Sequence, residues 1–384
     1  MNKKIKVAHI ITMLELGGAQ NNTLYTVQNL DKDKFDVVLI SGAGGILDQE
    51  TAKLANVKVI FIKNLLRQIN PFNDFFALMS LISILKKEKP DIVHTHSSKA
   101  GILGRFAAKI AGVPKIVHTF HGFGFNDFQT PLIRNIYIFS EKLTSLVSNK
   151  LIFVSEQNMS TAGFYKIGKK TDYLLVRSGI KLSNYRNIKI NTLAKKRELG
   201  LQENSKIITT IGPFKPQKNL IDFIKVAKNV SEKLTDVIFL IIGDGQQRNI
   251  LEEEIRKLKL TGKVLLLGWR NDINEILAIT DIFSMTSLWE GLPRSAVEAL
   301  VSGKPVIAYS IDGNNDIIKN GYNGFLTKPK DIDALSENII KLLKDEKLLN
   351  NLSQNAKNSI DGTFDIDYMV KQQENLYTNL IKER

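Results

Sequence analysis

The sequence contains no cysteine and no long hydrophobic run. Without any Cys among 384 residues, disulfides, thiolate metal sites and cysteine nucleophiles are excluded, as is typical of a reducing compartment. No stretch approaches the roughly 20 apolar residues that a membrane-spanning helix requires. The apolar run at 7–11 is too short for a signal peptide, and no small-residue cleavage site follows it. We therefore expect a cytoplasmic protein that does not span the membrane.

The composition is that of a globular protein with excess positive charge. Hydrophobic residues make up 43% and charged residues 24%, and nine prolines without a low-complexity tract argue against a long disordered arm. The formal charge is +14, and residues 1–175 carry 22 Lys and Arg against 13 Asp and Glu, a net charge of +9. A basic first half suits an anionic partner, such as nucleic acid, an acidic membrane surface or a phosphorylated acceptor. A generally lysine-rich composition is the alternative explanation.

Short β-type runs alternate with amphipathic segments along the whole chain. In the first half, the predicted strands are 5–11, 35–40, 57–62, 92–96, 115–119 and 151–154, and the predicted helices are 20–30, 72–87, 101–111 and 132–147. In the second half, the predicted strands are 207–211, 237–242, 264–267, 282–285 and 306–308, and the predicted helices are 220–234 and 246–260. Continuous Val/Ile runs separated by helices are typical of parallel strands buried on both faces. The pattern predicts an α/β protein with two doubly wound parallel sheets.

A polar stretch at 181–201 interrupts this alternation and is the best candidate for a linker. We predict one Rossmann-like domain at 1–180 and a second Rossmann-like domain at 181–364. The helix predicted at 365–384 is a candidate for crossing back to the first domain. Sheets of this kind bind ligands at the carboxyl ends of their strands, so we expect the two domains to face each other across a shared cleft.

Two strand-to-helix turns carry residues suited to an anionic ligand. Gly17 and Gly18 follow the first strand, where glycine lets the backbone approach an anion and the helix start offers free N–H groups. Their spacing fits neither a G-x-G-x-x-G fingerprint nor a P-loop. Lys215 and Lys218 follow the strand at 207–211, beside two prolines, and both can reach a diphosphate.

Four of the five histidines lie at the ends of two predicted strands, as His94, His96, His118 and His121. Two His at i and i+2 on a strand point to the same face, so a zinc site must be considered. Neither a Cys nor a nearby pair of carboxylates offers the remaining ligands, and we predict no metal there. We expect His94 and His118 to pack in the core, and His121 to hydrogen-bond or polarise a substrate.

The most informative segment is 286–300, which reads TSLWEGLPRSAVEAL. A predicted strand ends near Met285, a Gly-Leu-Pro turn follows, and a helix begins at about Pro293, since proline is favoured in a first helical turn. Glu290 in the turn and Glu298 in the helix can both face a ligand at the helix N-terminus, where the dipole favours phosphate. Carboxylates at these positions can accept hydrogen bonds from sugar and ribose hydroxyls.

Glu290 and Glu298, with seven residues between them, resemble the E-x7-E motif of the retaining GT-B glycosyltransferases of family 4. Further matches are found at 302–307, at 243–245, at 268–272, at Gly17-Gly18 and at His121-Gly122. These matches occur in the order and spacing of the family. The resemblance extends from about residue 5 to the C-terminus.

The resemblance implies that His121, Glu290 and Lys218 are the catalytic residues. His121 would contact the donor sugar near its reacting carbon, Glu290 would bind hydroxyls of that sugar, and Lys218 would neutralise the diphosphate. Retention in this family is generally described as front-face attack in which the leaving diphosphate helps to deprotonate the acceptor, so no enzymic nucleophile is required. The implied donor-binding residues are Gly17, Gly18, Lys215, Lys218, Gly243, Trp269, Arg270, Glu290, Gly291, Leu292, Pro293, Arg294 and Glu298. Among them, Glu298 would bind the ribose, and Trp269 and Arg270 would hold the base.

Pro213 departs from the family, which often has arginine directly after the glycine that corresponds to Gly212. Either Lys215 substitutes for that arginine or fewer charges hold the diphosphate. Asp-x-Asp pairs, the metal signature of the other major glycosyltransferase fold, occur at 31/33, 331/333 and 365/367. None follows a strand that faces the predicted cleft, so we expect no metal cofactor, and lysines and helix N-termini would stabilise the leaving group.

The segments 97–105 and 121–128 resemble the branch of the family that makes capsular, O-antigen or glycan-precursor saccharides. That branch mostly uses UDP-sugars, often N-acetylhexosamines, and polyprenyl-diphosphate-linked acceptors. The candidate acceptor-binding residues are Ser98, Lys99, Phe123 and Phe125. Phe128 adds a third aromatic residue to the loop at 121–128, and we expect this loop and the helix at 132–147 to contact the inner face of the plasma membrane. The alternative is that the phenylalanines are core and the helix is an ordinary packed layer.

The predicted function is the transfer of a hexose or N-acetylhexosamine from a UDP-sugar donor to a saccharide acceptor. A sugar-nucleotide epimerase of the same architecture and a non-catalytic donor-binding subunit are the alternatives. Nucleic-acid binding predicts basic–aromatic interleaving on one face, which is not visible. A Rossmann oxidoreductase would need the dinucleotide glycine pattern, which is absent.

Overall fold

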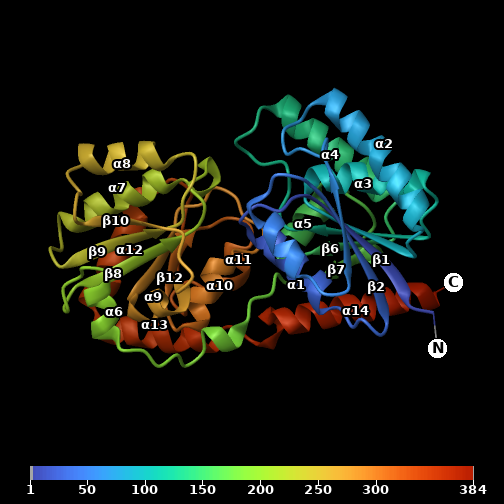
Figure 1. The fold of residues 1–384 in the computed structure, drawn as a ribbon. Helices are drawn as coiled ribbons and strands as arrows, with labels where there is room; N and C mark the ends of the chain where they lie inside the picture. The colour runs from blue at the N-terminus through green and yellow to red at the C-terminus, as the bar shows by residue number, and fades with distance from the viewer. Residues whose placement is uncertain (1–2, 384) are drawn as a thin grey trace. The chain divides into compact units, whose positions relative to one another are not determined.

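The computed structural model describes residues 3–383, which form two compact units (Figure 1). Unit 1 consists of the chain up to Gly179 together with the C-terminal segment from Ile366, and unit 2 consists of Ile180–Asp365. The C-terminal helix is therefore part of unit 1, although it follows unit 2 in the sequence.

Unit 1 contains a seven-stranded sheet with the order β3-β2-β1-β4-β5-β6-β7. All neighbouring strands are parallel. The strands are β1 (Ile5–Met13), β2 (Phe35–Gly42), β3 (Val57–Ile62), β4 (Ile92–His96), β5 (Lys115–Phe120), β6 (Lys150–Phe153) and β7 (Tyr173–Leu175). The helices are α1 (Gly18–Asn29), α2 (Pro71–Glu88), α3 (Ser98–Ile110), α4 (Pro131–Ser145), α5 (Glu156–Phe164) and α14 (Ile366–Lys382), with 3-10 segments at Ile46–Lys53 and Lys170–Asp172. The strand order reverses between β1 and β4, so the switch point of this sheet lies there.

Unit 2 contains a six-stranded parallel sheet with the order β10-β9-β8-β11-β12-β13. The strands are β8 (Lys206–Ile211), β9 (Val237–Ile242), β10 (Val264–Gly268), β11 (Ile282–Met285), β12 (Val306–Tyr309) and β13 (Gly324–Thr327). The helices are α6 (Thr192–Glu198), α7 (Leu220–Ser231), α8 (Arg248–Lys257), α9 (Ile273–Ile279), α10 (Arg294–Val301), α11 (Asn314–Ile317), α12 (Ile332–Lys344) and α13 (Glu346–Asn358). Short 3-10 segments lie at Leu182–Asn184, Pro216–Lys218 and Gly362–Phe364. Here the switch point lies between β8 and β11.

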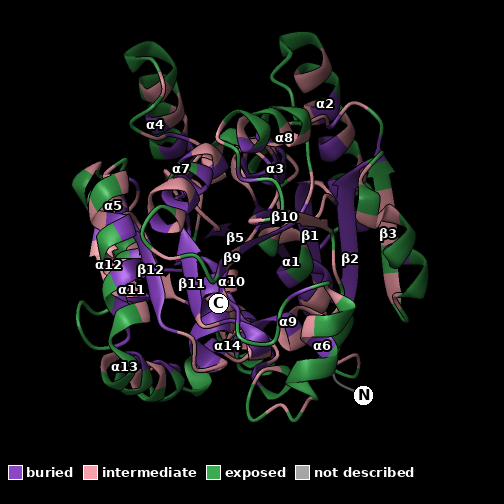
Figure 2. Cartoon of the chain, turned by 90° about the vertical axis from the view of Figure 1, so that its left-hand side faces the viewer, coloured by how far each residue is buried: buried purple, intermediate pink, exposed green. Residues whose placement is uncertain are grey.

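The central strands are buried on both faces, which explains their continuous Val/Ile runs. Val37, Val38 and Leu39 are successive residues of β2, and none of them is exposed. Figure 2 shows such strands as buried and the outer faces of the helices as exposed. The edge strands β7 and β13 differ, because they contain only 3 and 4 residues and are only partly buried. The sequence analysis missed both, since short edge strands lack a strong apolar run.

Helix α14 covers one face of the sheet in unit 1. Met369, Val370 and Tyr377 belong to the same hydrophobic core as residues of β1 and β2. Tyr377 is fully buried, and its ring meets the edge of Phe35 at a centroid distance of 5.9 Å. Burial of this helix therefore stabilises unit 1.

Arg105 and Glu141 form a buried ion pair between α3 and α4. Both side chains are at most 1% exposed, and Arg105 Nε also donates to the carbonyl of Gly101 at 2.8 Å. Burial raises the pKa of Glu141, and the neighbouring guanidinium of Arg105 opposes that rise. The pair ties the two helices together inside unit 1.

No helix within the described residues combines the length and the apolarity that a membrane crossing requires.

Candidate active site

The switch point of unit 2 brings the loops after β8 and β11 together. Leu288 N donates to the carbonyl of Gln217 at 2.9 Å, and Gln217 Nε2 donates back to the carbonyl of Trp289 at 2.8 Å. Thr286 Oγ1 donates to the carbonyl of Asn219 at 2.9 Å. These bonds hold the lysine-containing loop against the glutamate-containing loop at the carboxyl ends of the strands, where parallel sheets bind their ligands.

An ion pair between Lys218 and Glu290 lies at this junction. The two side chains are 13% and 9% exposed, so each charge depends on the other for compensation. The backbone of Glu290 is fixed as well, because its N–H donates to Asp312 Oδ2 at 2.8 Å. The sequence analysis predicted both residues for the site, and the structure places them in direct contact.

Glycine is required where the loops of unit 2 meet. A Cβ atom on Gly212 would lie 2.8 Å from Lys218 Cε, so the lysine side chain passes directly over this residue. A Cβ atom on Gly243, whose φ is +135°, would lie 2.0 Å from the carbonyl oxygen of Gly212. Gly212 therefore leaves room for the side chain of Lys218, and Gly243 leaves room for the backbone of Gly212. Phe214 is fully buried beneath this loop, and Lys215 begins the 3-10 turn that leads to Lys218.

Helix α10 begins beside the ion pair without a capping side chain. Pro293 is its N-cap residue, and its side chain makes no capping hydrogen bond to the first turn. An uncapped helix start leaves backbone N–H groups for a ligand, and its dipole favours an anion. Gly291 and Leu292 are buried in the turn before the helix. Arg294 Nε is buried and has no hydrogen-bond partner within residues 3–383.

Glu298 lies one turn into α10, and the hydroxyl of Tyr185 interacts with its carboxyl group. Burial raises the pKa of Glu298, while the charge of Arg294 opposes this rise. Burial also raises the pKa of the Tyr185 phenol, so the tyrosine remains a hydrogen-bond donor. The sequence analysis assigned Tyr185 to the linker and missed it, because nothing in its local pattern points to a site.

Trp269 and Arg270 follow β10, and the structure gives them different surroundings. Trp269 is 46% exposed. Arg270 lies in an ion-pair network, with Nη2 2.5 Å from Asp272 Oδ2 and 2.8 Å from Glu198 Oε1. Lys195 extends the network through its own 2.7 Å contact with Asp272. The guanidinium of Arg270 is thus engaged by carboxylates, and Trp269 is the more accessible of the two residues predicted to hold the base.

At the switch point of unit 1, Thr12 Oγ1 and Ser97 Oγ lie 2.7 Å apart, joining the ends of β1 and β4. Gly17 is the N-cap of α1, and Gly18 is its first residue, so no side chain caps this helix either. Ser98 begins α3. Lys99, predicted to bind the acceptor, forms an ion pair with Asp74 and is 13% exposed.

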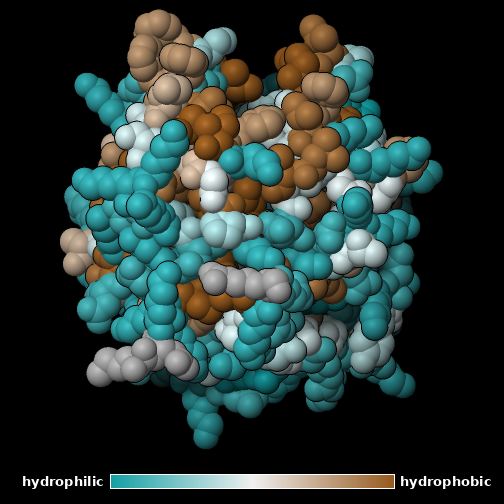
Figure 3. All heavy atoms as spheres, turned by 90° about the vertical axis from the view of Figure 1, so that its right-hand side faces the viewer, coloured by the Kyte–Doolittle hydropathy of each residue, from teal (hydrophilic) through white to brown (hydrophobic). Residues whose placement is uncertain are grey.

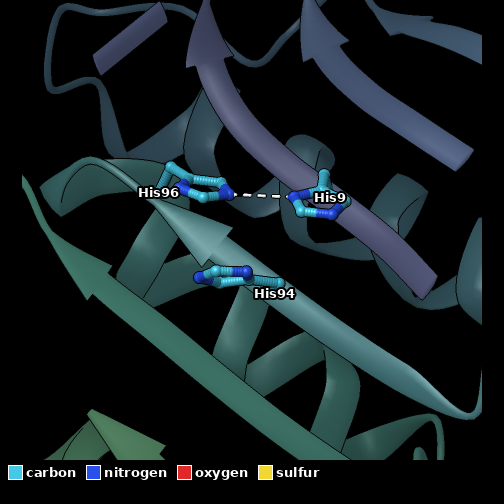
Figure 4. A group of neighbouring side chains, drawn as sticks. All are labelled: His9, His94 and His96. Atoms are coloured by element: carbon cyan, nitrogen blue, oxygen red, sulfur yellow. Dashed lines mark hydrogen bonds between the residues drawn. The ribbon is translucent and has the colours of Figure 1, made fainter. Parts of the chain in front are cut away.

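Three buried histidines gather in the sheet of unit 1 (Figure 4). His94 and His96 lie on the same strand, β4. His9 joins them because β1 is the neighbour of β4 in the sheet, with His9 opposite His94. One ligand nitrogen from each ring lies within 4.8 Å of the others. Both nitrogens of His94 are engaged, Nδ1 with the hydroxyl of Tyr377 at 2.5 Å and Nε2 with that of Thr119 at 2.7 Å.

His118 is also in the core, as expected, and its Nδ1 lies 2.8 Å from Thr95 Oγ1. His121, at the carboxyl end of β5, is partly exposed, and its Nε2 lies 3.1 Å from His96 Nδ1. His121 therefore stands where a strand end meets the surface, connected to the buried cluster behind it.

The structure corrects the expectation for the aromatic loop at 121–128. Phe125 is only 6% exposed and belongs to a core cluster that includes Ile138 of α4. Phe123 is partly buried and stacks on Phe125 at a centroid distance of 4.6 Å. Only Phe128, 46% exposed, projects from this trio of phenylalanines. The sequence of the loop alone does not indicate which of its phenylalanines pack toward the core.

Comparisons with known proteins agree over the whole chain. The family model for "Glycosyltransferase Family 4" matches residues 16–161, and that for "Glycosyl transferases group 1" matches residues 191–359. The chain is 36% identical over 383 residues to UDP-Gal:alpha-D-GlcNAc-diphosphoundecaprenol alpha-1,3-galactosyltransferase of Escherichia coli, covering 99% of this chain and 98% of the relative. It is 26% identical to the capsular polysaccharide biosynthesis glycosyltransferase CapM of Staphylococcus aureus, covering 99% of each. The crystal structure of HepE of Anabaena in complex with UDP superposes with a TM-score of 0.82 at 19% identity, covering 98% of this chain and 100% of that one.

Proposed function

Because the chain belongs to glycosyltransferase family 4 and has the GT-B fold, we propose that it is a retaining enzyme that uses a UDP-linked hexose or N-acetylhexosamine as its donor. The observation that carries the proposal is the Lys218–Glu290 ion pair beside the uncapped start of α10. This place combines a cation, free backbone N–H groups and a carboxylate. These are the groups that a diphosphate and the hydroxyls of a sugar need.

Each part of the donor has a partner in unit 2. Lys218 and the first turn of α10 bind the diphosphate and stabilise the charge that develops on the leaving group. Glu290 accepts hydrogen bonds from the donor sugar once the diphosphate competes for Lys218. Glu298 accepts from the ribose, and Trp269 packs on the base. The 36% identical relative is named for a UDP-galactose donor, which supports the choice of UDP.

We further propose that the acceptor is a saccharide linked to polyprenyl diphosphate. The same relative is named for an acceptor of this kind. A lipid-linked acceptor resides at a membrane, so the enzyme must work at a bilayer surface. Such an enzyme needs an apolar surface that meets the bilayer.

Two helices of unit 1 expose apolar stripes on the same side of that unit. The exposed apolar residues of α2, together with Ile69 shortly before the helix, are Ile69, Phe72, Phe75, Phe76 and Met79. In α4 and the residue after it, they are Leu132, Ile133, Ile136, Phe139, Leu143 and Leu146. Their spacing of three and four residues places each set on one helical face. Figure 2 shows α2 and α4 projecting from the top of the view, and Figure 3 shows hydrophobic residues at the top of the molecule.

We propose that this α2–α4 surface lies on the cytoplasmic face of the plasma membrane, as an interfacial contact. The exposed fractions reach 73% for Phe72 and 78% for Leu146, more than scattered surface apolar residues would explain. The positive charge of the chain favours an anionic bilayer. The segment of α4 was predicted from the sequence to contact a membrane, whereas that of α2 was not.

We also propose that transfer needs no divalent metal. Two of the Asp-x-Asp pairs have other roles, since Asp31 pairs with Lys34 at 2.6 Å and Asp331 caps α12 by accepting from Ala334 N at 3.0 Å. Lys218 and α10 take the place that a cation would otherwise fill.

A transfer assay tests the proposed function directly. The full-length protein is incubated with UDP-sugars and an N-acetylhexosamine linked to polyprenyl diphosphate, with and without EDTA, and products are identified by mass spectrometry and NMR. We expect one added sugar with the anomeric configuration of the donor, in equal yield with EDTA. Release of an epimerised sugar-nucleotide without transfer would support the epimerase instead. An inverted product or complete loss with EDTA would contradict the proposal.

A further inference from the structure

Helix α3 lies between α2 and α4 in the layer that covers one face of the sheet in unit 1, and it contacts both neighbours. Lys99 of α3 forms an ion pair with Asp74 of α2. Arg105, further along α3, forms the buried ion pair with Glu141 of α4. These two pairs hold α2 and α4 beside α3.

A hollow separates the projecting parts of α2 and α4. Figure 2 shows the two helices as separate projections at the top of the view. Figure 3 is drawn from the opposite side and shows two projections with a hollow between them, and hydrophobic residues lie on both projections and below the hollow. Because α3 is the helix between α2 and α4, it forms the floor of this hollow. We call it the α3 groove.

The floor of the α3 groove is apolar. Ile102, Phe106 and Ile110 follow one another at intervals of four residues, so they share one face of α3. Ile102 and Phe106 are half-buried, and Ile110 is 57% exposed. The opposite face of α3, which includes Ala107 and Ala108, is buried in the core against the sheet. The apolar stripe therefore faces away from the sheet.

Helix α2 supplies one wall of the groove. Phe75, Met79 and Ile82 follow one another at four and three residues, so they too form a stripe along one helical face. Their exposed fractions fall from 58% and 49% to 9% along this stripe. Ile82 belongs to the same core cluster as residues of α3. The stripe thus runs from the surface down to the contact between α2 and α3.

Helix α4 supplies the other wall. Tyr137 lies on the side of α4 that faces α3, because Tyr137 and Ser98 of α3 both flank Gly124. A Cβ atom on Gly124 would lie 3.1 Å from Tyr137 Cδ1 and 2.6 Å from Ser98 Oγ. Ile133 precedes Tyr137 by one turn, so it lies on the same side of α4, and it is 46% exposed.

Lys99 lies at one end of the groove. Helix α3 begins just after β4 ends, so its first turn is at the carboxyl ends of the strands. Lys99 precedes Ile102 by three residues and lies on the same face of α3. From Lys99 to Ile110 the helix rises about 16 Å. The groove therefore offers a cation at the carboxyl edge of the sheet and an apolar floor that leads away from that edge.

We propose that the α3 groove binds the polyprenyl chain of the acceptor, with the acceptor diphosphate at Lys99. The proposal rests on the proposed function, from which it takes the acceptor. In such an acceptor an anionic diphosphate joins a saccharide to a long apolar chain, and the groove presents partners for the diphosphate and the chain in this order. The diphosphate competes with Asp74 for Lys99, and the saccharide extends toward the carboxyl ends of the strands. Because the α2–α4 surface borders the groove, the chain enters it from the bilayer.

Photo-crosslinking to the full-length protein tests the groove without requiring transfer. The probe is polyprenyl diphosphate with a diazirine in its chain, in detergent, and the labelled peptides are identified by mass spectrometry. We expect labelling of 98–110 and of the facing parts of α2 and α4, with competition by unlabelled polyprenyl diphosphate and not by phospholipid. Labelling elsewhere in the chain, or equal labelling by a phospholipid that carries the diazirine, would overturn the proposal.

Transfer kinetics with two acceptors separate the chain from the diphosphate. Both acceptors carry the same saccharide diphosphate, one on a polyprenyl chain and one on a short alkyl chain. Phe106→Ser and Ile110→Glu should each raise KM for the polyprenyl acceptor about tenfold and change KM for the short acceptor less than about twofold, because only the long chain reaches these residues. Lys99→Met should raise KM for both acceptors, since both carry the diphosphate.

Phe164→Ser is the matched control and should leave KM for both acceptors unchanged, because Phe164 is 78% exposed on α5, outside the α2–α4 surface. Ile110 is an exposed residue, so Ile110→Glu tests the groove even if Phe106→Ser fails to fold. Equal changes in KM for the two acceptors, or no change in Ile110→Glu, would overturn the proposal. If the wild type transfers sugar to neither acceptor, the proposed function is contradicted, and the crosslinking still decides whether the groove binds the chain.

Discussion

The ammonium of Lys218 forms an ion pair with the carboxylate of Glu290, which lies 72 residues further along the chain. The two residues come from the loops after β8 and β11, the neighbours at which the strand order of unit 2 reverses. In the absence of a ligand the carboxylate neutralises the lysine. A bound diphosphate would compete for the lysine and release the carboxylate to the sugar.

This competition predicts opposite effects of Glu290→Gln on binding and on turnover. Without the carboxylate, Lys218 is free for the diphosphate, so the affinity for UDP should rise several-fold. Transfer should fall by about 100-fold, because the sugar loses an acceptor that is strengthened in the transition state. Calorimetry with UDP and initial-rate kinetics measure the two effects. Weaker UDP binding with unchanged kcat would contradict the competition.

Glu298 should make UDP binding sensitive to pH. Burial raises its pKa above the ordinary 4.5, so the carboxylate that accepts from ribose becomes protonated at a higher pH than an exposed glutamate would. UDP affinity should therefore fall as the pH decreases from 7 toward 5. Glu298→Gln should bind UDP about tenfold more weakly at pH 7 and should flatten this dependence. Equal pH profiles for the two proteins would exclude Glu298 as the ribose acceptor.

The buried pair Arg105–Glu141 should stabilise unit 1 only as a pair. Glu141→Leu leaves an uncompensated guanidinium in the core and should lower the free energy of unfolding by about 3–5 kcal/mol. The double variant Arg105→Met/Glu141→Leu removes both charges and should recover most of that loss. Urea unfolding of the single and double variants measures the difference. If the double variant is less stable than the single one, the pair has a role beyond charge compensation.

The α2–α4 surface should determine membrane binding. The triple variant Phe72→Ser/Phe75→Ser/Met79→Ser should reduce co-sedimentation with anionic liposomes at least tenfold, since each exposed side chain contributes roughly 1 kcal/mol or more of transfer free energy. Ile250→Ser is the control, because Ile250 is 53% exposed on α8 of unit 2. Wild-type protein that stays in the supernatant at low salt would show that the surface serves another partner.

The sequence predicted the central strands and the E-x7-E segment because both leave local signals. Continuous apolar runs mark buried parallel strands, and the central strands β4, β9 and β11 have the predicted bounds. The edge strand β3 also has its predicted bounds, because it keeps an apolar run of six residues. Glu290 and Lys218 each follow a strand. Because the carboxyl ends of parallel strands lie at the same edge of the sheet, this position alone predicts that the two residues are close together. The edge strands β7 and β13 were not predicted, because a strand of three or four residues lacks such an apolar run.

Residues that depend on tertiary contacts could not be predicted. His9 joins His96 only because β1 and β4 are neighbours in the sheet, and nothing around His9 in the sequence marks it. Tyr185 reaches Glu298 from a segment that resembles a linker. Arg270 forms an ion pair with Glu198, 72 residues earlier in the chain, which its Gly-Trp-Arg context does not indicate. Each of these depends on the packing of segments distant in the sequence.

Calorimetric titration of UDP into the wild type and into Lys218→Met tests the site in unit 2 most directly. Lys225→Met is the matched control, because Lys225 is an exposed lysine on α7, which follows the same loop. We predict that the wild type and the control bind UDP equally, and that Lys218→Met binds about tenfold more weakly or worse, because one charge-assisted contact to the diphosphate is lost. Equal affinity in all three proteins, or no binding of UDP to the wild type, would contradict the proposed donor site.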